Sequence, residues 1–138
     1  MMYLSMFSKE KKELFLEFAY HIAKIDGGCS KEEESIMQLY ANEMHLEEWN
    51  LSQERDIDII LNEIIECSEK RDLKIFVFEV LGLVLVDGVY DEREKALLNK
   101  VIDIFQLDNN YLQSCKDKLE KYLILQQEIN SLVIEQGD

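Results

Sequence analysis

The chain has 138 residues, 47% of them apolar and 32% charged, and its 29 acidic and 15 basic side chains give a formal net charge of −14. This length and composition are typical of one folded domain and exclude a disordered chain. The acidic balance argues against nucleic acid or an anionic membrane as a partner, because both are bound through basic surfaces. Such a charge would attract a divalent cation or a basic protein partner, but its simplest explanation is solubility alone.

The cysteines and the N-terminal residues indicate the cellular compartment. Cys29, Cys67 and Cys115 are odd in number and far apart, and they form no CxxC pair or zinc-ligand spacing. Residues 1–7 contain no basic side chain and no long apolar run, so they do not read as a signal peptide. The longest apolar stretch is shorter than the roughly 20 residues of a membrane span. We therefore expect a cytoplasmic protein with reduced cysteines and no membrane insertion.

Long helices are favoured because the chain contains no proline and only five glycines. In the first of them, Ser8 is a suitable cap, Leu14, Phe18 and Ile22 recur at helical spacing, and Gly27 is a suitable stop. The same reasoning along the chain predicts six helices, at about residues 8–26, 30–44, 54–67, 69–87, 92–105 and 109–130.

The segment 69–87 is ambiguous by itself, since it is apolar on every side and rich in strand-forming residues. An internal repeat resolves the ambiguity: a shift of 61 residues places Phe15 on Phe76 and Asp26 on Asp87. We therefore predict an all-α fold, an internally duplicated bundle of about six helices built from two pseudo-twofold-related three-helix units. The single domain covers 1–138, with repeats at about 8–67 and 69–130 and a core around helices 8–26 and 69–87.

Each repeat contains an apolar residue, an Asp-Gly pair and a glutamate seven residues after the aspartate. The candidate site residues are therefore Asp26 and Glu33 in the first copy and Asp87 and Glu94 in the second. The glutamates have a structural interpretation, because Ser30 with Glu33 and Asp91 with Glu94 have the spacing of a capping box.

Asp26 and Asp87 are harder to explain structurally, because a carboxylate in the last turn of a helix faces the negative end of the helix dipole. Two kinds of interaction can compensate for this unfavourable position. The carboxylates can accept hydrogen bonds from amides of the following loop, or they can help to bind a hard cation such as calcium or magnesium together with the two glutamates. The spacing does not match the twelve-residue loop of an EF-hand.

No other side chain suggests catalysis. Cys29 has no obvious base beside it, His21 is on a different helix face from Asp26, and His45 is explained by its position near a helix end. An enzyme that uses the motif carboxylates as acid and base is the least favoured reading, because it needs a cleft with separated pKa values.

At the doubled Asp-Gly-x5-Glu motif, over about residues 8–130, the chain resembles the TerB-like family, the tellurite-resistance helical domain. The same module resembles the N-terminal region of membrane-anchored DnaJ-like co-chaperones. The resemblance implies an all-helical, duplicated domain of a bacterial cytoplasm, with divalent-cation binding near the two turns. The residues whose positions match, and to which this implied cation binding applies, are Asp26, Glu33, Asp87 and Glu94. The sequence contains no J domain and no membrane anchor, so the co-chaperone role does not transfer.

Two functional hypotheses follow. The first is a non-enzymatic cytosolic module, associated with stress or tellurite resistance, that holds a divalent cation through the two motifs. The second is a protein-interaction scaffold whose acidic face docks a basic partner, with purely structural turns; its binding should weaken steeply with salt.

Overall fold

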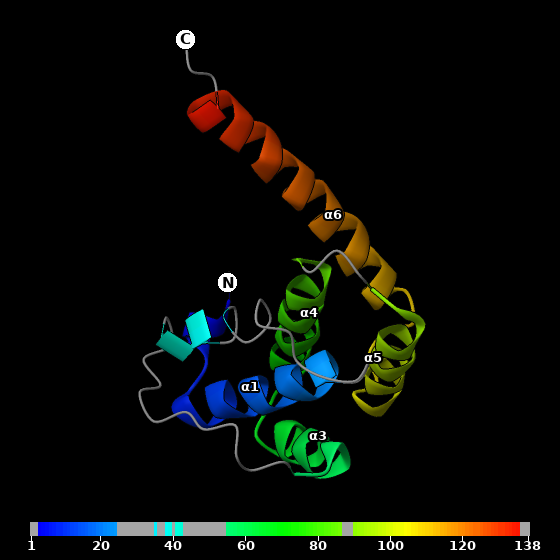
Figure 1. The fold of residues 1–138 in the computed structure, drawn as a ribbon. Coiled ribbons are helices and arrows are strands. Elements are labelled where there is room, and N and C mark those ends of the chain that lie inside the picture. Colours follow the sequence, from blue (N-terminus) through cyan, green and yellow to red (C-terminus); the bar gives the residue numbers. More distant parts are fainter. Residues whose placement is uncertain are drawn as a thin grey trace.

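The computed structural model describes residues 3–24, 35, 38–39, 41–42, 55–86 and 90–135. Within these ranges the chain is helical and contains no strand, which confirms the predicted all-α class. Figure 1 shows the arrangement of the helices. The described elements are η1 (Leu4–Met6), α1 (Lys9–Lys24), α3 (Ile57–Glu66), α4 (Lys70–Val86), α5 (Glu92–Ile104), α6 (Tyr111–Asn130) and the short π-helix η2 (Ser131–Glu135).

The helix α1 begins where the sequence predicts it. The Ser8 hydroxyl accepts a hydrogen bond from the Lys11 amide at 3.3 Å, which is the expected N-cap interaction. The apolar face is completely buried at Phe15, Phe18 and Ile22. Amphipathic spacing and a cap are both encoded within a few residues, so the prediction of this helix is confirmed.

The helix α4 is the central element, and its helical state confirms the prediction for the ambiguous segment. It packs against α1 on one side and α6 on another (Figure 1). The Phe76 ring is fully buried and stacks on the Phe7 ring with centroids 4.8 Å apart. The buried Glu79 carboxylate accepts a hydrogen bond from the Tyr3 amide at 2.7 Å. A helix buried on several sides must be apolar nearly all round, and this explains its strand-like composition.

The helices α3 and α5 also lie within the predicted ranges. α5 ends in a Schellman motif, in which the Leu107 amide donates to the Ile102 carbonyl and Gln106 takes a positive φ of 55°. The predicted helix at 30–44 lies mostly outside the described residues. Those of its residues that the structure describes are helical.

The helix α6 belongs to the helical body only in its first half. Leu112, Cys115 and Leu119 are buried against the rest of the molecule. Beyond them the helix continues away from the other described helices, so that its C-terminal half stands clear (Figure 1). The apolar spacing predicted the helix correctly, but it did not predict where the core ends along it.

Candidate functional site

Of the four predicted site residues, the structure describes one. Asp26, Glu33 and Asp87 lie outside the described residues, so their predicted roles stay predictions. Glu94 is buried, and it forms the predicted capping box with Asp91: its amide donates to the Asp91 carboxylate at 2.9 Å, and its own carboxylate accepts from the Asp91 amide at 3.1 Å. The structural interpretation of the second motif is therefore confirmed at this pair.

The electrostatic effect of Glu94 reaches a neighbouring ring. Burial, together with the negative charge of Glu94, raises the pKa of Tyr90 to about 12. Among the residues that the structure describes, no group of three or more His, Cys, Asp or Glu side chains is placed to hold a metal ion. The cation hypothesis therefore depends on residues outside the described ranges.

An arginine that the sequence analysis did not select joins α1 to the start of α3. The Arg55 guanidinium donates two hydrogen bonds to the Glu17 carboxylate, each 2.9 Å long, and a third to Glu63 at 2.7 Å. The hydrogen bonds to Glu17 and Glu63 raise the pKa of Arg55. His21 is also part of this cluster, since its Nε2 lies 2.6 Å from the Arg55 carbonyl oxygen. Glu17 and His21 are 38 and 34 residues from Arg55, so the local patterns contained no signal for this link between α1 and α3.

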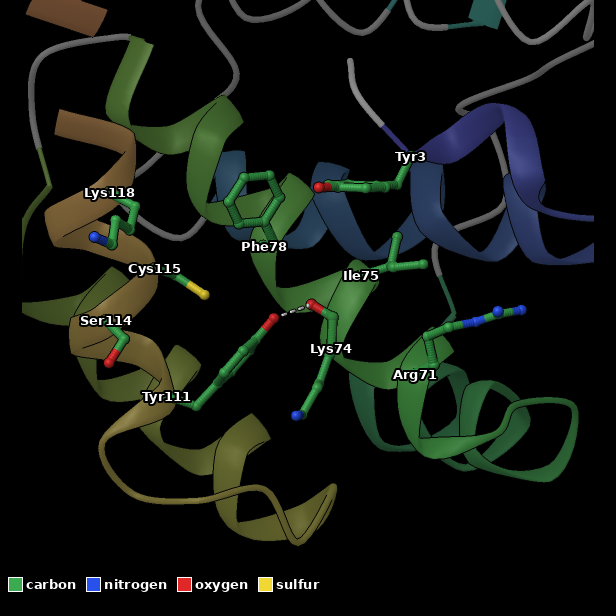
Figure 2. A pocket seen from close by; sticks show the side chains of 9 residues that line it. All are labelled: Tyr3, Arg71, Lys74, Ile75, Phe78, Tyr111, Ser114, Cys115 and Lys118. Carbon is green, nitrogen blue, oxygen red and sulfur yellow. Dashed lines mark hydrogen bonds between the residues drawn. The ribbon is translucent and has the colours of Figure 1, made fainter. Parts of the chain in front are cut away.

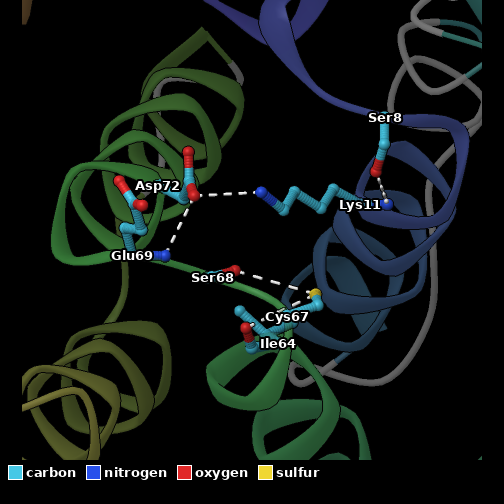
Figure 3. A network of polar contacts seen from close by, with 7 residues as sticks. All are labelled: Ser8, Lys11, Ile64, Cys67, Ser68, Glu69 and Asp72. Carbon is cyan, nitrogen blue, oxygen red and sulfur yellow. Dashed lines mark hydrogen bonds and ion pairs between the residues drawn. The ribbon is translucent and has the colours of Figure 1, made fainter.

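A second polar cluster joins α1 to the start of α4 (Figure 3). The Asp72 carboxylate accepts hydrogen bonds from the Lys11 ammonium and from the Glu69 amide, both at 3.0 Å. Burial acts to raise the pKa of Asp72, but the Glu69 amide and the Lys11 ammonium outweigh it and hold that pKa below its usual value. Asp72 therefore remains ionised at neutral pH and serves both as a helix cap and as an ion-pair partner.

A cavity of about 340 Å³ lies between α4 and the first half of α6 (Figure 2). The Tyr111 hydroxyl donates to the Lys74 carbonyl at 2.8 Å and closes one side of it. Burial raises the pKa of the Cys115 thiol, so this sulfur is protonated at neutral pH and is a poor nucleophile. The cavity is lined by Tyr3, Arg71, Lys74, Ile75, Phe78, Tyr111, Ser114, Cys115 and Lys118. All of them except Tyr3 lie on α4 or α6, so the sequence indicates this cavity only once the two helices are known to be neighbours.

The second half of α6 and the following η2 expose apolar side chains, and several of them lie along one face. We call this the α6 strip and define it as Tyr122, Leu125 and Ile129 of α6 together with Leu132 of the following π-helix η2, which are 44%, 53%, 49% and 64% exposed. The segment 122–134 contains a single charged residue, Glu128, in a chain that is 32% charged overall. An uncharged, apolar and exposed helix face of this length is unusual on the surface of a monomeric protein.

Comparisons of the chain with protein-family models, with curated proteins and with solved structures give no match. None of the helices that the structure describes is long and apolar enough to cross a membrane.

Proposed function

We propose that this chain is a non-enzymatic helical interaction module that pairs with a second copy of itself through the α6 strip. The observation that carries the proposal is the exposure of the strip. Contact between these apolar side chains and water is unfavourable, and a second surface that covers them removes this cost. The first half of the same helix already supplies the contacts that hold it to α4. The second half is therefore free to serve a partner.

The spacing of the strip fits pairing with a like helix. Its three members in α6 are separated by three and four residues, the alternation that keeps one face of a helix against a neighbour, and Leu132 follows three residues later at the start of η2. In heptad terms Tyr122 and Ile129 occupy the a positions, and Leu125 and Leu132 occupy the d positions. Among parallel coiled coils, a β-branched residue at a with leucine at d favours two strands, and Ile129 with Leu125 and Leu132 follows this rule. The proposed assembly is a short, parallel two-helix contact.

The area of the strip sets the expected affinity. With roughly 100 Å² exposed on each side chain, the strip removes on the order of 800 Å² from water when two copies pair. Flanking residues at the edges of the seam raise this to the lower limit of specific interfaces, about 1,000–1,200 Å². We therefore expect a weak, reversible dimer rather than an obligate one.

The charge distribution supports a second copy as the partner. Two chains with a net charge of −14 repel each other in general. The segment 122–134 carries only Glu128, so pairing through it brings few like charges together. Because the contact is apolar, we expect the association to change little with salt, in contrast to the salt-sensitive docking of a basic partner.

The test compares two adjacent isoleucine and leucine positions. Leu125 is 53% exposed and lies in the strip, whereas Ile124 is 56% exposed and points about 100° away from it around the helix. Light scattering over a range of protein concentrations should show a monomer–dimer equilibrium for the wild type and for Ile124→Glu, and a monomer for Leu125→Glu. A wild type that stays monomeric at all concentrations, or two variants with the same effect, would overturn the proposal.

We also propose the finer architecture, an internal duplication with a pseudo-twofold axis, as in the TerB-like family that the chain resembles. Equivalent positions of two repeats contact each other where they lie close to a twofold axis. In support, two contacting pairs are separated by the repeat length of 61 residues: Lys11 with Asp72, whose Nζ and Oδ2 are 3.0 Å apart, and Phe15 with Phe76, whose ring centroids are 6.3 Å apart. In addition, α3 packs on α1 as α6 packs on α4.

A second candidate function is cation binding, and the same pairs favour it because a pseudo-twofold would relate the two Asp-Gly motifs. We propose calcium or magnesium as the ion, with Asp26, Asp87 and Glu33 as ligands and Glu94 limited by its capping role. Thermal unfolding of EDTA-treated protein should shift upward with the ion, since ligand at about 100 times Kd adds roughly 2.7 kcal/mol. The shift should disappear in the Asp26→Asn/Asp87→Asn double variant. An equal shift in that variant, or none in the wild type, would exclude the site.

A further inference from the structure

We propose that the cavity between α4 and α6 binds a small amphiphilic carboxylate, with an unbranched apolar chain of about eight carbons and a single anionic head. This site is separate from the α6 strip, and its occupancy does not depend on the proposed self-association. The proposal combines three features of the cavity: its apolar floor, its size and the charges at its rim.

The floor of the cavity is apolar and already organised. Ile75 and Cys115 are buried, and the half-buried Phe78 ring meets the Tyr3 ring edge to face with centroids 5.8 Å apart. Figure 2 shows the Cys115 sulfur and the Tyr111 ring directed into the space between the two helices. Because the Tyr111 hydroxyl is engaged with the Lys74 carbonyl at 2.8 Å, that polar atom does not demand a partner from a ligand. Such a surface favours a hydrocarbon body.

The size of the cavity limits the ligand. Its volume of about 340 Å³ is close to the lower end for small-molecule sites. At roughly 30 Å³ for each non-hydrogen atom, as in liquid water, it has room for about ten such atoms. Octanoate has this size and is therefore the probe of choice.

The rim of the cavity is positively charged, although the chain as a whole is acidic. Arg71, Lys74 and Lys118 all line it, and none of the described residues that line it is acidic. Among the described residues, neither Arg71 nor Lys118 forms an ion pair, even though acidic residues outnumber basic ones by 29 to 15. The Lys74 ammonium lies 5.5 Å from the centre of the Tyr111 ring, beside the opening.

This arrangement selects for charge as well as for hydrophobicity. Arg71 and Lys74 stand on the α4 side of the cavity and Lys118 on the α6 side (Figure 2), and each is carried on a long, exposed side chain that can reach a head group at the mouth. A carboxylate gains a favourable interaction with them, while its hydrocarbon chain occupies the floor between Ile75, Phe78 and Cys115. An uncharged analogue gains only the contact between its hydrocarbon chain and the apolar floor.

The first test is titration calorimetry of the full chain with octanoate, 1-octanol and acetate. For a ligand of this size we expect octanoate to bind with a Kd on the order of 1 mM. We expect 1-octanol to bind about tenfold more weakly, because it lacks the charge, and acetate to show no saturation, because it lacks the chain. Equal affinity for octanoate and 1-octanol, or no saturable octanoate binding, would overturn the proposal.

The second test uses two lysines on successive turns of α6. Lys118 lines the cavity and Lys121 does not, although both are exposed and neither forms an ion pair among the described residues. Charge reversal in Lys118→Glu should weaken octanoate binding about tenfold, whereas Lys121→Glu should change it less than about twofold. Equal effects of the two variants would mean that octanoate responds to net charge and not to this site. Repeating the titration with Leu125→Glu separates the result from self-association, since that variant should bind octanoate as the wild type does.

Discussion

The helices α3 and α6 occupy similar places and differ in how much of their length the molecule uses. α3 packs on α1, and α6 packs on α4. α3 has 10 residues, and its apolar face is buried from Ile60 to Ile64. α6 has 20 residues, and its second half together with η2 exposes the α6 strip. A helix about as long as α3 satisfies the core, so the additional length of α6 has to be explained by something outside it.

The two helices also differ in how their first turns are held. The Asp56 carboxylate caps α3 by accepting from the Asp58 amide at 3.3 Å, and Arg55 beside it clamps α1 to α3. α6 begins at Asn110 with no side-chain cap, and its N-terminal tie to α4 is the hydrogen bond from Tyr111. Polar interactions therefore secure the short helix at its start, whereas α6 depends more on apolar packing.

The largest expected effect separates a core leucine of α3 from an exposed leucine of α6. Leu61 is 1% exposed and Leu125 is 53% exposed. Leu61→Ala should lower the free energy of unfolding by about 3 kcal/mol, because it leaves a cavity in the core. Leu125→Ala should change it by less than about 0.5 kcal/mol in dilute solution, where the proposed dimer is dissociated. Urea denaturation measures both values. A large loss for Leu125→Ala in dilute protein would show that the outer half of α6 belongs to the core.

A smaller change in the free energy of unfolding is expected at the contact between α1 and α4. α3 packs on the first of these helices and α6 on the second. Asp72→Asn should cost about 1–2 kcal/mol at neutral pH, because it removes the charge that Lys11 and the Glu69 amide stabilise. The pKa of Asp72 is lowered in the folded protein, so its contribution is fully present above the unfolded-state pKa of about 4 and is lost as the pH falls through the lower folded value.

The measurement is the free energy of unfolding of wild type and Asp72→Asn at a series of pH values, and the difference between them should shrink on acidification. Asp117→Asn on the exposed surface of α6 is the matched control, since within the described part of the chain Asp117 accepts its hydrogen bond from Gln113 of the same helix. Its cost should stay within about 0.5 kcal/mol. A cost for Asp72→Asn that does not change with pH would contradict the assignment of an ionised Asp72.

The smallest expected change in the free energy of unfolding is at the N-terminal ends of α3 and α6. Asp56→Ala removes the side-chain cap of α3 and should lower the free energy of unfolding by about 1 kcal/mol. Asn110→Ala at the start of α6 should cost only a few tenths of a kcal/mol, because Asn110 forms no capping hydrogen bond there. Thermal and urea unfolding of the two variants measure the difference. Equal costs would mean that α6 is capped in solution as α3 is.

The predictions that succeeded are those that depend on neighbours along the chain. Helical spacing and a serine cap predicted α1, and the capping box of Asp91 and Glu94 was predicted from a spacing of three residues. The assignment of α4 as a helix needed one step more, the repeat that aligns Phe15 with Phe76. Capping and periodicity act within one or two turns, so the sequence contains all the information that they require.

Other features could not be predicted in this way, because they depend on which helix faces contact each other in the folded protein. The Arg55 clamp joins residues 38 positions apart, and the cavity is lined by two helices and by Tyr3 near the N-terminus. The α6 strip has the same apolar spacing as a buried helix face, and only its position beyond the body distinguishes it.

The sequence by itself determined the helical class, the starts and ends of most described helices and the cap formed by Glu94, because short-range hydrogen bonds and apolar periodicity are local properties of the chain. Only the tertiary structure decided that the first half of α6 is core and the second half surface, and that three cations gather around one apolar cavity. Burial and charge proximity arise from contacts between distant segments, and the spacing of residues along one helix does not specify them.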